Sequence, residues 1–263
     1  MDAFEPGPGV IIVDKPAGIS SARVVDILRR VTGIRRTGHG GTLDPFATGL
    51  LPVLVGREFT READELLAGD KEYVLTVRFG SETDTCDLTG VVVARGEGAL
   101  PSQAGIREAL SPFVGDIDQE APAYSALKHE GKPLYWYARR GNPVVKPPRK
   151  VRIDAVELVE YLAPDLVLRV ACGKGAYMRS LARDLGRSLG CFGHLVALRR
   201  TRIGRYGIDQ AVPLWLIERF PTAPRLPATR LDVPAGCRTV PADVDSMGQV
   251  PPCLDLPVRD RDL

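Results

Sequence analysis

The chain has 263 residues, 44% of them hydrophobic and 26% charged, with a formal net charge of +2. That length holds one large domain, or one domain with a small appendage. The sequence has neither an apolar run long enough to cross a membrane nor a secretory leader at its start, so we expect a soluble, cytoplasmic protein. Five cysteines without a C-x-x-C spacing argue against a disulfide framework and a zinc site.

The first part of the chain predicts a strand, a turn and an amphipathic helix. Residues 9–14 (GVIIVD) are typical of a buried strand, and Lys15 opens the turn KPAG that follows. Ser20 or Ser21 can cap the next helix. The apolar face of that helix consists of Val24, Val25, Ile27, Leu28 and Val31.

A glycine-rich loop at residues 38–49 (GHGGTLDPFATG) contains a single carboxylate, Asp44. In one interpretation Asp44 caps a helix, Pro45 is its first residue, and residues 46–48 begin the first turn. In the other, the loop presents Asp44 as a nucleophile or general base, with His39 and the glycine amides lining the same cavity. The loop lacks the G-K-S/T ending of a phosphate-binding P-loop. Local spacing alone favours the helix cap.

The middle of the chain predicts short elements around an acidic turn. Residues 57–68 are polar and helix-like, and residues 71–80 (KEYVLTVRFG) alternate in part, as a strand with Tyr73 near its start would. The turn at 81–90 carries Asp84 but lacks the glycine and the final glutamate of a calcium-binding loop, so we expect no metal site there. Ser102 is placed to cap a short helix at 102–114.

Basic and aromatic side chains interleave between residues 124 and 152. The basic residues are Lys128, Lys132, Arg139, Arg140, Lys146, Arg149, Lys150 and Arg152, and the aromatic residues are Tyr124, Tyr135, Trp136 and Tyr137. Such a mixture suits a phosphate backbone with splayed bases. A plain basic surface beside a small aromatic cluster is the alternative.

The last third predicts a strand pair at 151–160 and 164–172, followed by a helix that opens within 173–181 and ends near Gly190. Arg179 falls in the first turn of that helix, where a cation opposes the helix dipole, so we expect it to have a carboxylate partner. In the segment 194–202 (HLVALRRTR), Leu198 is expected in the core and His194 in a structural role.

A series of ordered motifs resembles the TruB-type tRNA pseudouridine synthases. They are the segment at 14–21 (DKPAGISS), the loop at 38–49, K-x-Y at 71–73, the acidic turn at 83–90, SALK at 125–128 with Y-x-x-A-R at 135–139, K-G-x-Y-x-R at 174–179 and H-x-x-x-L-R-R at 194–200. The resemblance implies that Asp44 is the catalytic aspartate, that Arg179 pairs with it, and that Tyr73 packs against the target base.

The resemblance also implies a set of substrate-binding residues and a substrate. The residues are His39, Tyr177, Leu198, Asp84, Lys15, Lys128 and Arg139, with His39 in the space vacated by a flipped base and Leu198 as a wall of the uracil pocket. The substrate is the T-loop uridine of tRNA at position 55. The isomerisation requires no cofactor and no metal, and the family is expected to act as a monomer without a protein partner.

The implied fold is α+β, a mixed and largely antiparallel sheet flanked by helices with the active cleft across it. We expect a catalytic domain at residues 1–215, with an RNA-binding insertion at about 124–152. Residues 221–263 are rich in proline and acids, so we expect residues 216–263 to form a reduced, partly disordered segment in place of the β-rich RNA-binding domain common in the family.

Three other functions remain open at this point. A guide-RNA-dependent pseudouridine synthase shares the motifs, although it normally carries a well-formed C-terminal domain for its guide. An RNA-binding protein without chemistry would use the basic segment and would not need Asp44. A metal-dependent phosphoryl-transfer enzyme would use Asp44, Asp84 and Asp87, and a chelator would abolish its activity.

Overall fold

The computed structural model describes residues 8–61 and 68–219. The strands are β1 (Gly9–Lys15), β2 (Thr37–His39), β3 (Thr48–Val55), β4 (Lys71–Phe79), β5 (Ser81–Thr83), β6 (Val92–Arg95), β7 (Gly115–Gln119), β8 (Lys128–His129), β9 (Lys132–Pro133), β10 (Arg149–Leu162), β11 (Asp165–Cys172), β12 (Gly193–Ile203), β13 (Tyr206–Gly207) and β14 (Val212–Pro213). The α-helices are α1 (Ser21–Thr32), α2 (Arg57–Arg61), α4 (Gln103–Leu110), α5 (Leu134–Ala138), α6 (Met178–Ser188) and α7 (Leu214–Arg219), with short 3₁₀ turns at Ser111–Phe113 and Ile208–Gln210.

One large mixed sheet organises the described residues. Its strand order is β14-β1-β3-β12-β4-β11-β10-β7, with β2 beside β3 and β13 beside β12. The β1–β14 and β3–β12 pairs are parallel and the other pairs of this sheet are antiparallel. Both the α+β class and the largely antiparallel character of the sheet, as predicted, are therefore confirmed.

The burial of the central strands follows their apolar pattern. Every second residue of β4, from Lys71 to Phe79, is buried, which confirms the predicted alternation. In β3 all residues after Thr48 are buried, as is usual for a strand covered on both faces. Ser20 and Ser102 cap α1 and α4 through their side chains, as predicted.

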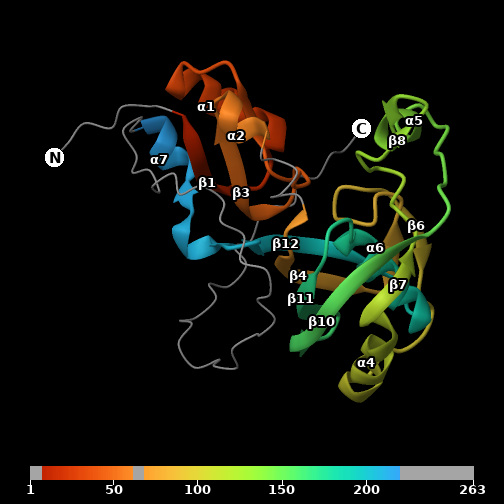
Figure 1. Ribbon diagram of the computed structural model, residues 1–263. Helices are drawn as coiled ribbons and strands as arrows, with labels where there is room; N and C mark the ends of the chain where they lie inside the picture. Colours follow the sequence, from red (N-terminus) through yellow and green to blue (C-terminus); the bar gives the residue numbers. More distant parts are fainter. Residues whose placement is uncertain (1–7, 62–67, 220–263) are drawn as a thin grey trace, which may run out of the picture. The chain divides into compact units, whose positions relative to one another are not determined.

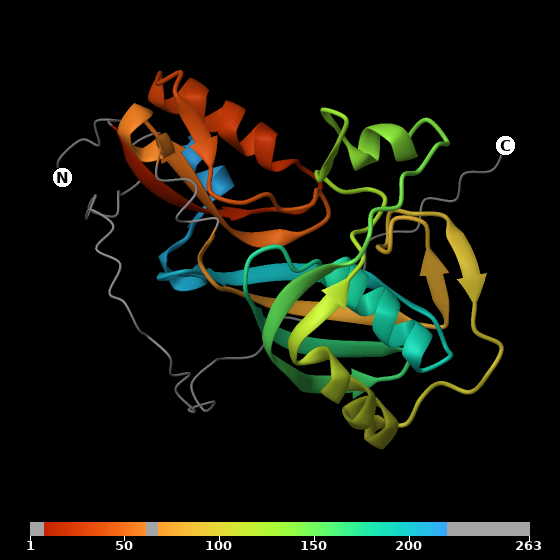
Figure 2. The ribbon, with the colours of Figure 1, turned by 45° about the vertical axis from the view of Figure 1, so that its right-hand side comes forward.

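The helices lie against different parts of the sheet (Figure 1). Helix α1 packs on β2, β3 and α7, whereas α6 packs on β12 and β4, and α4 packs on α6 and β10. Figures 1 and 2 both show α5, with its neighbours β8 and β9, standing apart from the sheet. The basic and aromatic residues 128–140, which include β8, β9 and α5, therefore form a projection that is separate from the sheet.

Strand β12 joins the two parts of the sheet. It pairs antiparallel with β4 along its length and parallel with β3 at Arg199 and Arg200. There the backbone of Gly49 comes so close that an added Cβ would lie 2.3 Å from the carbonyl oxygen of Arg200, and Gly49 has a positive φ of 98°. This approach brings the end of the glycine-rich loop against β12.

Some predicted features lie partly or wholly outside the described residues. Helix α2 covers the start of the predicted 57–68 helix, and residues 62–67 lie outside the description. Of the predicted segment 216–263, residues 220–263 lie outside it, together with two of the five cysteines. The other three, Cys86, Cys172 and Cys191, are free and buried. None of the helices in the described part of the chain has the length and apolar character needed to cross a bilayer.

Candidate active site

Asp44 lies on the turn between β2 and β3, and no helix follows it. The amide of Ala47 donates to the carbonyl of Asp44 at 3.1 Å, and β3 begins at the next residue, Thr48. The helix-cap interpretation of Asp44 is therefore wrong. Its physical reason is tertiary: residues 48–55 pair with β1 and β12, and this pairing overrides the local preference of an Asp-Pro sequence for a helix start.

Arg179 forms a two-point ion pair with Asp44. Its Nε donates to Oδ2 at 2.9 Å and its Nη2 to Oδ1 at 3.0 Å. The carboxylate partner expected for an arginine in the first turn of α6 is thus present. The arginine side chain is 4% exposed and the aspartate side chain 31% exposed. The pair consequently presents its acidic member to solvent and its basic member to the interior.

The other donors of Arg179 bind the two loops beside α6. Nη1 donates to the carbonyl of Thr85 and Nη2 to the carbonyl of Tyr124, each at 2.9 Å. Asp87, which is buried, places Oδ2 3.7 Å from Nη1. The arginine therefore fixes three separate segments around Asp44, and a fixed guanidinium holds a carboxylate in one orientation.

Asp87 is a site residue that the sequence analysis considered only as a metal ligand. Its Oδ1 accepts hydrogen bonds from the hydroxyls of Thr85 and Thr89 and from the amide of Thr89. This network closes the 83–90 turn and leaves Oδ2 facing Arg179. The T-x-D-x-T spacing that makes the turn was a readable signal, whereas the approach of Arg179 from a distant helix was not.

Lys15 is fully buried and binds the backbone of the glycine-rich loop at Pro45. Its Nζ donates to the carbonyls of Pro16, Ile19 and Pro45, at 2.8, 2.8 and 3.2 Å. An ammonium group has three donors, so none remains for a substrate. We therefore replace the predicted role of Lys15 in substrate binding with one in holding Pro45, the neighbour of Asp44.

Burial and charge act in opposite directions on these groups. Burial raises the pKa of the Asp44 carboxyl, and the charge and hydrogen bonds of Arg179 oppose that rise. Burial lowers the pKa of the Lys15 ammonium to about 8, although the negative charge of Asp44 raises it. The pKa of Asp44 is raised overall, and Arg179 is the largest of the influences that favour its ionised form.

Arg200 is a third buried cation, and it contacts the glycine-rich loop. It is 1% exposed, and it donates to the carbonyls of Leu50 at 2.8 Å and Gly41 at 3.1 Å. Burial first, and then the charge of Arg200, lower the pKa of His39. Burial raises the pKa of Tyr73, against the charge of Arg200, which lowers it. The imidazole and the phenol are thus both kept neutral near neutral pH.

Tyr73 and His39 reach this region from different strands. Tyr73 on β4 pairs in register with Arg200 on β12, and its side chain is largely buried. His39 on β2 pairs with Val53 on β3, and its Nδ1 is buried without a hydrogen-bond partner among the described residues. The charge of Arg200 lowers the pKa of both side chains.

Tyr177 and Leu198 lie on the elements that carry Arg179 and Arg200. Tyr177 is the residue at the N-cap of α6, two positions before Arg179. Leu198 is 7% exposed on β12, and its carbonyl accepts a hydrogen bond from the hydroxyl of Thr48 at 3.5 Å, at the start of β3. His194 is buried and its Nδ1 lies 2.9 Å from the carbonyl of Ser81, in the structural role expected for it.

The remaining predicted residues lie in the outer loops. Asp84 accepts the amide of Val91 at 2.8 Å and the hydroxyl of Tyr124 at 3.2 Å. Lys128 is exposed on β8, and Arg139 is exposed at the end of α5. Neither cation contacts the Asp44–Arg179 pair in the described structure, so the projection and the pair are separate, linked through Tyr124.

Cations and aromatic rings do interleave on the projection, as the sequence indicated. Trp136 lies between Lys132, at 3.8 Å from the ring centre, and Arg140, at 3.7 Å. Arg139 lies 5.4 Å from the ring centre of Tyr135. Such contacts fix the cations at defined positions and leave their charge toward solvent.

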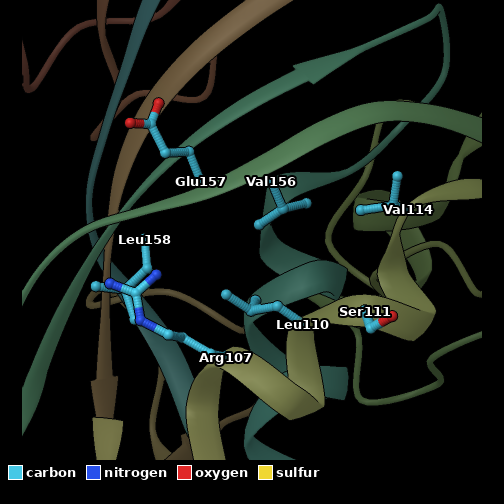
Figure 3. Close-up of a pocket in the computed structure, with 7 residues that line it drawn as sticks. All are labelled: Arg107, Leu110, Ser111, Val114, Val156, Glu157 and Leu158. Carbon is cyan, nitrogen blue, oxygen red and sulfur yellow. The ribbon is translucent and has the colours of Figure 1, made fainter. Parts of the chain in front are cut away.

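Two further observations concern other possible sites. Across residues 8–61 and 68–219, no group of three His, Cys, Asp or Glu side chains is arranged to hold a metal ion. A hollow of about 330 Å³ lies between α4 and β10, with Leu110, Val114 and Val156 in its wall and Arg107 and Glu157 beside them (Figure 3). None of the predicted site residues lines it.

Comparison with known proteins agrees with these motifs. The profile of the TruB family pseudouridylate synthase N-terminal domain matches residues 29–178, and that of the tRNA pseudouridylate synthase B C-terminal domain matches residues 179–220. A tRNA pseudouridine synthase B of Bordetella pertussis is 46% identical over 87% of this chain and 94% of its own length. One of Chlamydia muridarum is 44% identical over 80% of this chain and 86% of its own.

Solved structures show the same fold. A chain in the crystal structure of a Cbf5–Nop10–Gar1 complex is 30% identical with a TM-score of 0.64, over 82% of this chain and 55% of that one. The two profiles together span residues 29–220, a range that includes both Asp44 and Arg179. The chain belongs to the TruB family of pseudouridylate synthases.

Proposed function

We propose that this chain converts uridine to pseudouridine in tRNA, at position 55 of the T loop, as a cytoplasmic monomer without a cofactor. The observation that carries the proposal is the Asp44–Arg179 pair, because it combines an accessible carboxylate with a buried arginine that keeps it ionised and oriented. The relatives named tRNA pseudouridine synthase B support the substrate.

The reaction breaks the C1′–N1 bond of uridine and forms a C1′–C5 bond, while C5 loses a proton and N1 gains one. It needs a carboxylate beside C1′ and C6 and a pocket that retains the free uracil. Asp44 meets the first need from its turn between β2 and β3. Its carboxylate can attack C6, attack C1′ or assist a glycal route, and all three require it to be ionised.

The pocket is assigned to three side chains around Asp44. Tyr73, a neutral and largely buried phenol on β4, stacks on the uracil and carries the C5 proton. Tyr177 and Leu198 close the pocket from α6 and β12, the two elements that also carry Arg179 and Arg200. Asp44 and Arg179 supply the charged part of the site and these three residues its apolar part.

The target base must leave its stack before Asp44 can reach it, which costs a few kcal/mol. His39 has a neutral ring, and we assign it to the space that the base leaves, where it stacks within the RNA loop. Lys128 and Arg139 bind phosphates from the projection. Asp84 uses two of its acceptor positions within the protein and keeps others for a ribose hydroxyl.

The test is tritium release from a tRNA transcript labelled with 5-[³H]uridine. Wild-type protein should release label from the T-loop uridine, and a transcript with cytidine at that position should release none. Asp44→Ala should lower the rate at least about 10³-fold while tRNA binding remains, since an essential reacting group is lost. Normal release by a folded Asp44→Ala protein would refute the proposal.

One second candidate has a specific observation in its favour. The likeness to a chain of the Cbf5–Nop10–Gar1 complex favours a synthase that acts within an assembly with other macromolecules. The same assay separates the two, because a standalone enzyme modifies the transcript with no other RNA or protein present. Tight binding of the transcript with no release under any condition would instead indicate an RNA-binding protein without chemistry.

A further inference from the structure

Gln119, at the end of β7, holds the backbone of Tyr177 by two hydrogen bonds. Its Nε2 donates to the carbonyl of Tyr177 at 3.0 Å, and its Oε1 accepts the amide of Tyr177 at 2.7 Å. The glutamine is 2% exposed. The side-chain amide of Gln119 therefore pairs with both the backbone N–H and the backbone carbonyl of Tyr177, as a residue on a neighbouring strand would.

The residue held in this way is the one from which α6 begins. Tyr177 has extended dihedral angles, φ −106° and ψ 115°, and its own side chain makes no capping hydrogen bond. Met178 is the first helical residue and Arg179 the second. The position of the residue before a helix sets the direction of its first turn. Fixing Tyr177 therefore also fixes the direction in which the Arg179 side chain points from α6.

The chain after Gln119 continues along the first turns of α6. The carbonyl of Glu120 accepts the hydroxyl of Ser180 at 2.7 Å, and the carbonyl of Tyr124 accepts Arg179 at 2.9 Å. Gln119 is thus one of several attachments between this segment and the helix. In this attachment the side chain of Gln119 binds the backbone of Tyr177, so a substitution at Gln119 can remove it without altering the backbone.

A second side chain holds Tyr177 from the neighbouring strand. Arg149 on β10 is the cross-strand partner of Gln119. It donates to the carbonyl of Gly175 at 2.6 Å, and its guanidinium lies 5.1 Å from the ring centre of Tyr177. Gln119 fixes the backbone of Tyr177, while Arg149 lies against its ring and the preceding loop.

We propose that Gln119 is a positioning residue for the isomerisation, acting through Tyr177 and Arg179 on the uracil and on Asp44. The inference rests on the proposed function, in which those residues form the pocket and the ion pair. A glutamine is suited to this position because its amide is both a donor and an acceptor. Loss of the clamp lets the Arg179–Asp44 geometry relax, and misplacement by about 1 Å can cost a reaction about 100-fold.

The decisive variant is Gln119→Met, which keeps the length and most of the volume of the side chain and removes both hydrogen bonds. We expect the single-turnover rate at saturating tRNA to fall about 10- to 100-fold, with the Kd for tRNA within about threefold of wild type. The acid limb of its pH–rate profile should move to higher pH, because Asp44 is held less well by Arg179.

Gln119→Glu provides the second, independent measurement. An ionised carboxylate cannot donate to the carbonyl of Tyr177, whereas a protonated one regains the donor. The rate of this variant relative to wild type should therefore rise as the pH falls, and that of Gln119→Met should not. The charged groups next to this position are Arg149 across the strands and Glu120, which pairs with Arg183.

Gln103→Glu is the matched control, since Gln103 lies exposed at the start of α4, and it should behave as wild type. Wild-type rates for Gln119→Met, or a loss confined to tRNA binding, would overturn the inference. If Gln119→Met fails to fold, a pH-independent relative rate for Gln119→Glu would overturn it. Asp44→Ala, assayed alongside, must be inactive; if it is active, the proposed function itself fails.

Discussion

Arg179 and Asp44 lie 135 positions apart in the chain and meet through two hydrogen bonds of 2.9 and 3.0 Å. The arginine side chain is buried and the aspartate side chain is partly exposed, at 4% and 31%. An arginine in this arrangement cannot lose its charge and has little freedom to move. It therefore acts as a fixed counter-charge for a carboxylate that burial alone would tend to protonate.

The first prediction concerns the pH dependence of activity. Asp44 must be ionised to act, so activity falls as the pH drops through its pKa. Arg179→Lys replaces the two-point pair by a single contact, so the opposing effect of burial prevails and the pKa of Asp44 rises further. The acid limb of kcat/KM should move to higher pH, and kcat/KM at neutral pH should fall about 10- to 100-fold.

Arg187→Lys is the control for that experiment. Arg187 lies on the same helix as Arg179 and forms its own two-point pair, with Glu82 on β5, at 2.7 and 2.6 Å. Its substitution should leave the acid limb where wild type has it. An unchanged acid limb in Arg179→Lys would show that this arginine does not govern the ionisation of Asp44.

The second prediction concerns RNA affinity. Lys128→Ala and Arg139→Ala should each weaken tRNA binding about 3- to 10-fold at low salt, with kcat unchanged at saturating tRNA. Each should also reduce the slope of log K against log salt concentration by about 0.7 to 0.9, the value for one lost phosphate contact. Arg107→Ala removes an exposed charge from α4 and should change neither quantity. An equal effect of all three would mean that only total charge matters.

The third prediction concerns Lys15. Its pKa is about 8 in the folded protein, against 10.5 for an unperturbed lysine in the unfolded chain. Between those two values the unfolded chain binds one more proton than the folded chain, so stability rises with pH. The free energy of unfolding of wild type minus that of Lys15→Met should therefore increase by about 3 kcal/mol from pH 8 to pH 10.5. Urea denaturation at several pH values measures it.

Lys174→Met removes an exposed ammonium group from the loop before α6 and serves as the comparison. It should show no such increase. A constant difference between wild type and Lys15→Met over this pH range would contradict the buried, charge-disfavouring environment of Lys15.

The fourth prediction is that one type of substitution has opposite effects on two helices. In Gly186→Ala the new Cβ would lie 2.2 Å from the backbone nitrogen of Gly193, so α6 must move off β12, costing about 3 kcal/mol of stability or more. In Gly105→Ala the nearest atom is 3.5 Å away, and the helix should gain roughly 0.5 to 1 kcal/mol. Denaturation midpoints of the two variants should lie on opposite sides of wild type.

Local patterns were sufficient for much of the scaffold. The alternation in β4, the apolar run of β1 and the serine caps of α1 and α4 depend on residues close in sequence, and all were predicted. The same physics explains the expected partner of Arg179, because a cation at a helix N-terminus needs compensation nearby. The ordered motifs then indicated Asp44 as the candidate catalytic residue, although residue types alone had favoured a helix cap at that position.

Other features were decided by the tertiary structure. Asp44 ends on a turn because β3 pairs with strands far away in sequence, and Lys15 faces three carbonyls because the loop folds over it. Asp87 meets Arg179 only once α6 lies beside the 83–90 turn, and Gln119 binds Tyr177 only once the end of β7 lies beside the start of α6. Sequence encodes the type of each side chain and its local periodicity, whereas these contacts depend on which distant strand or helix supplies the partner.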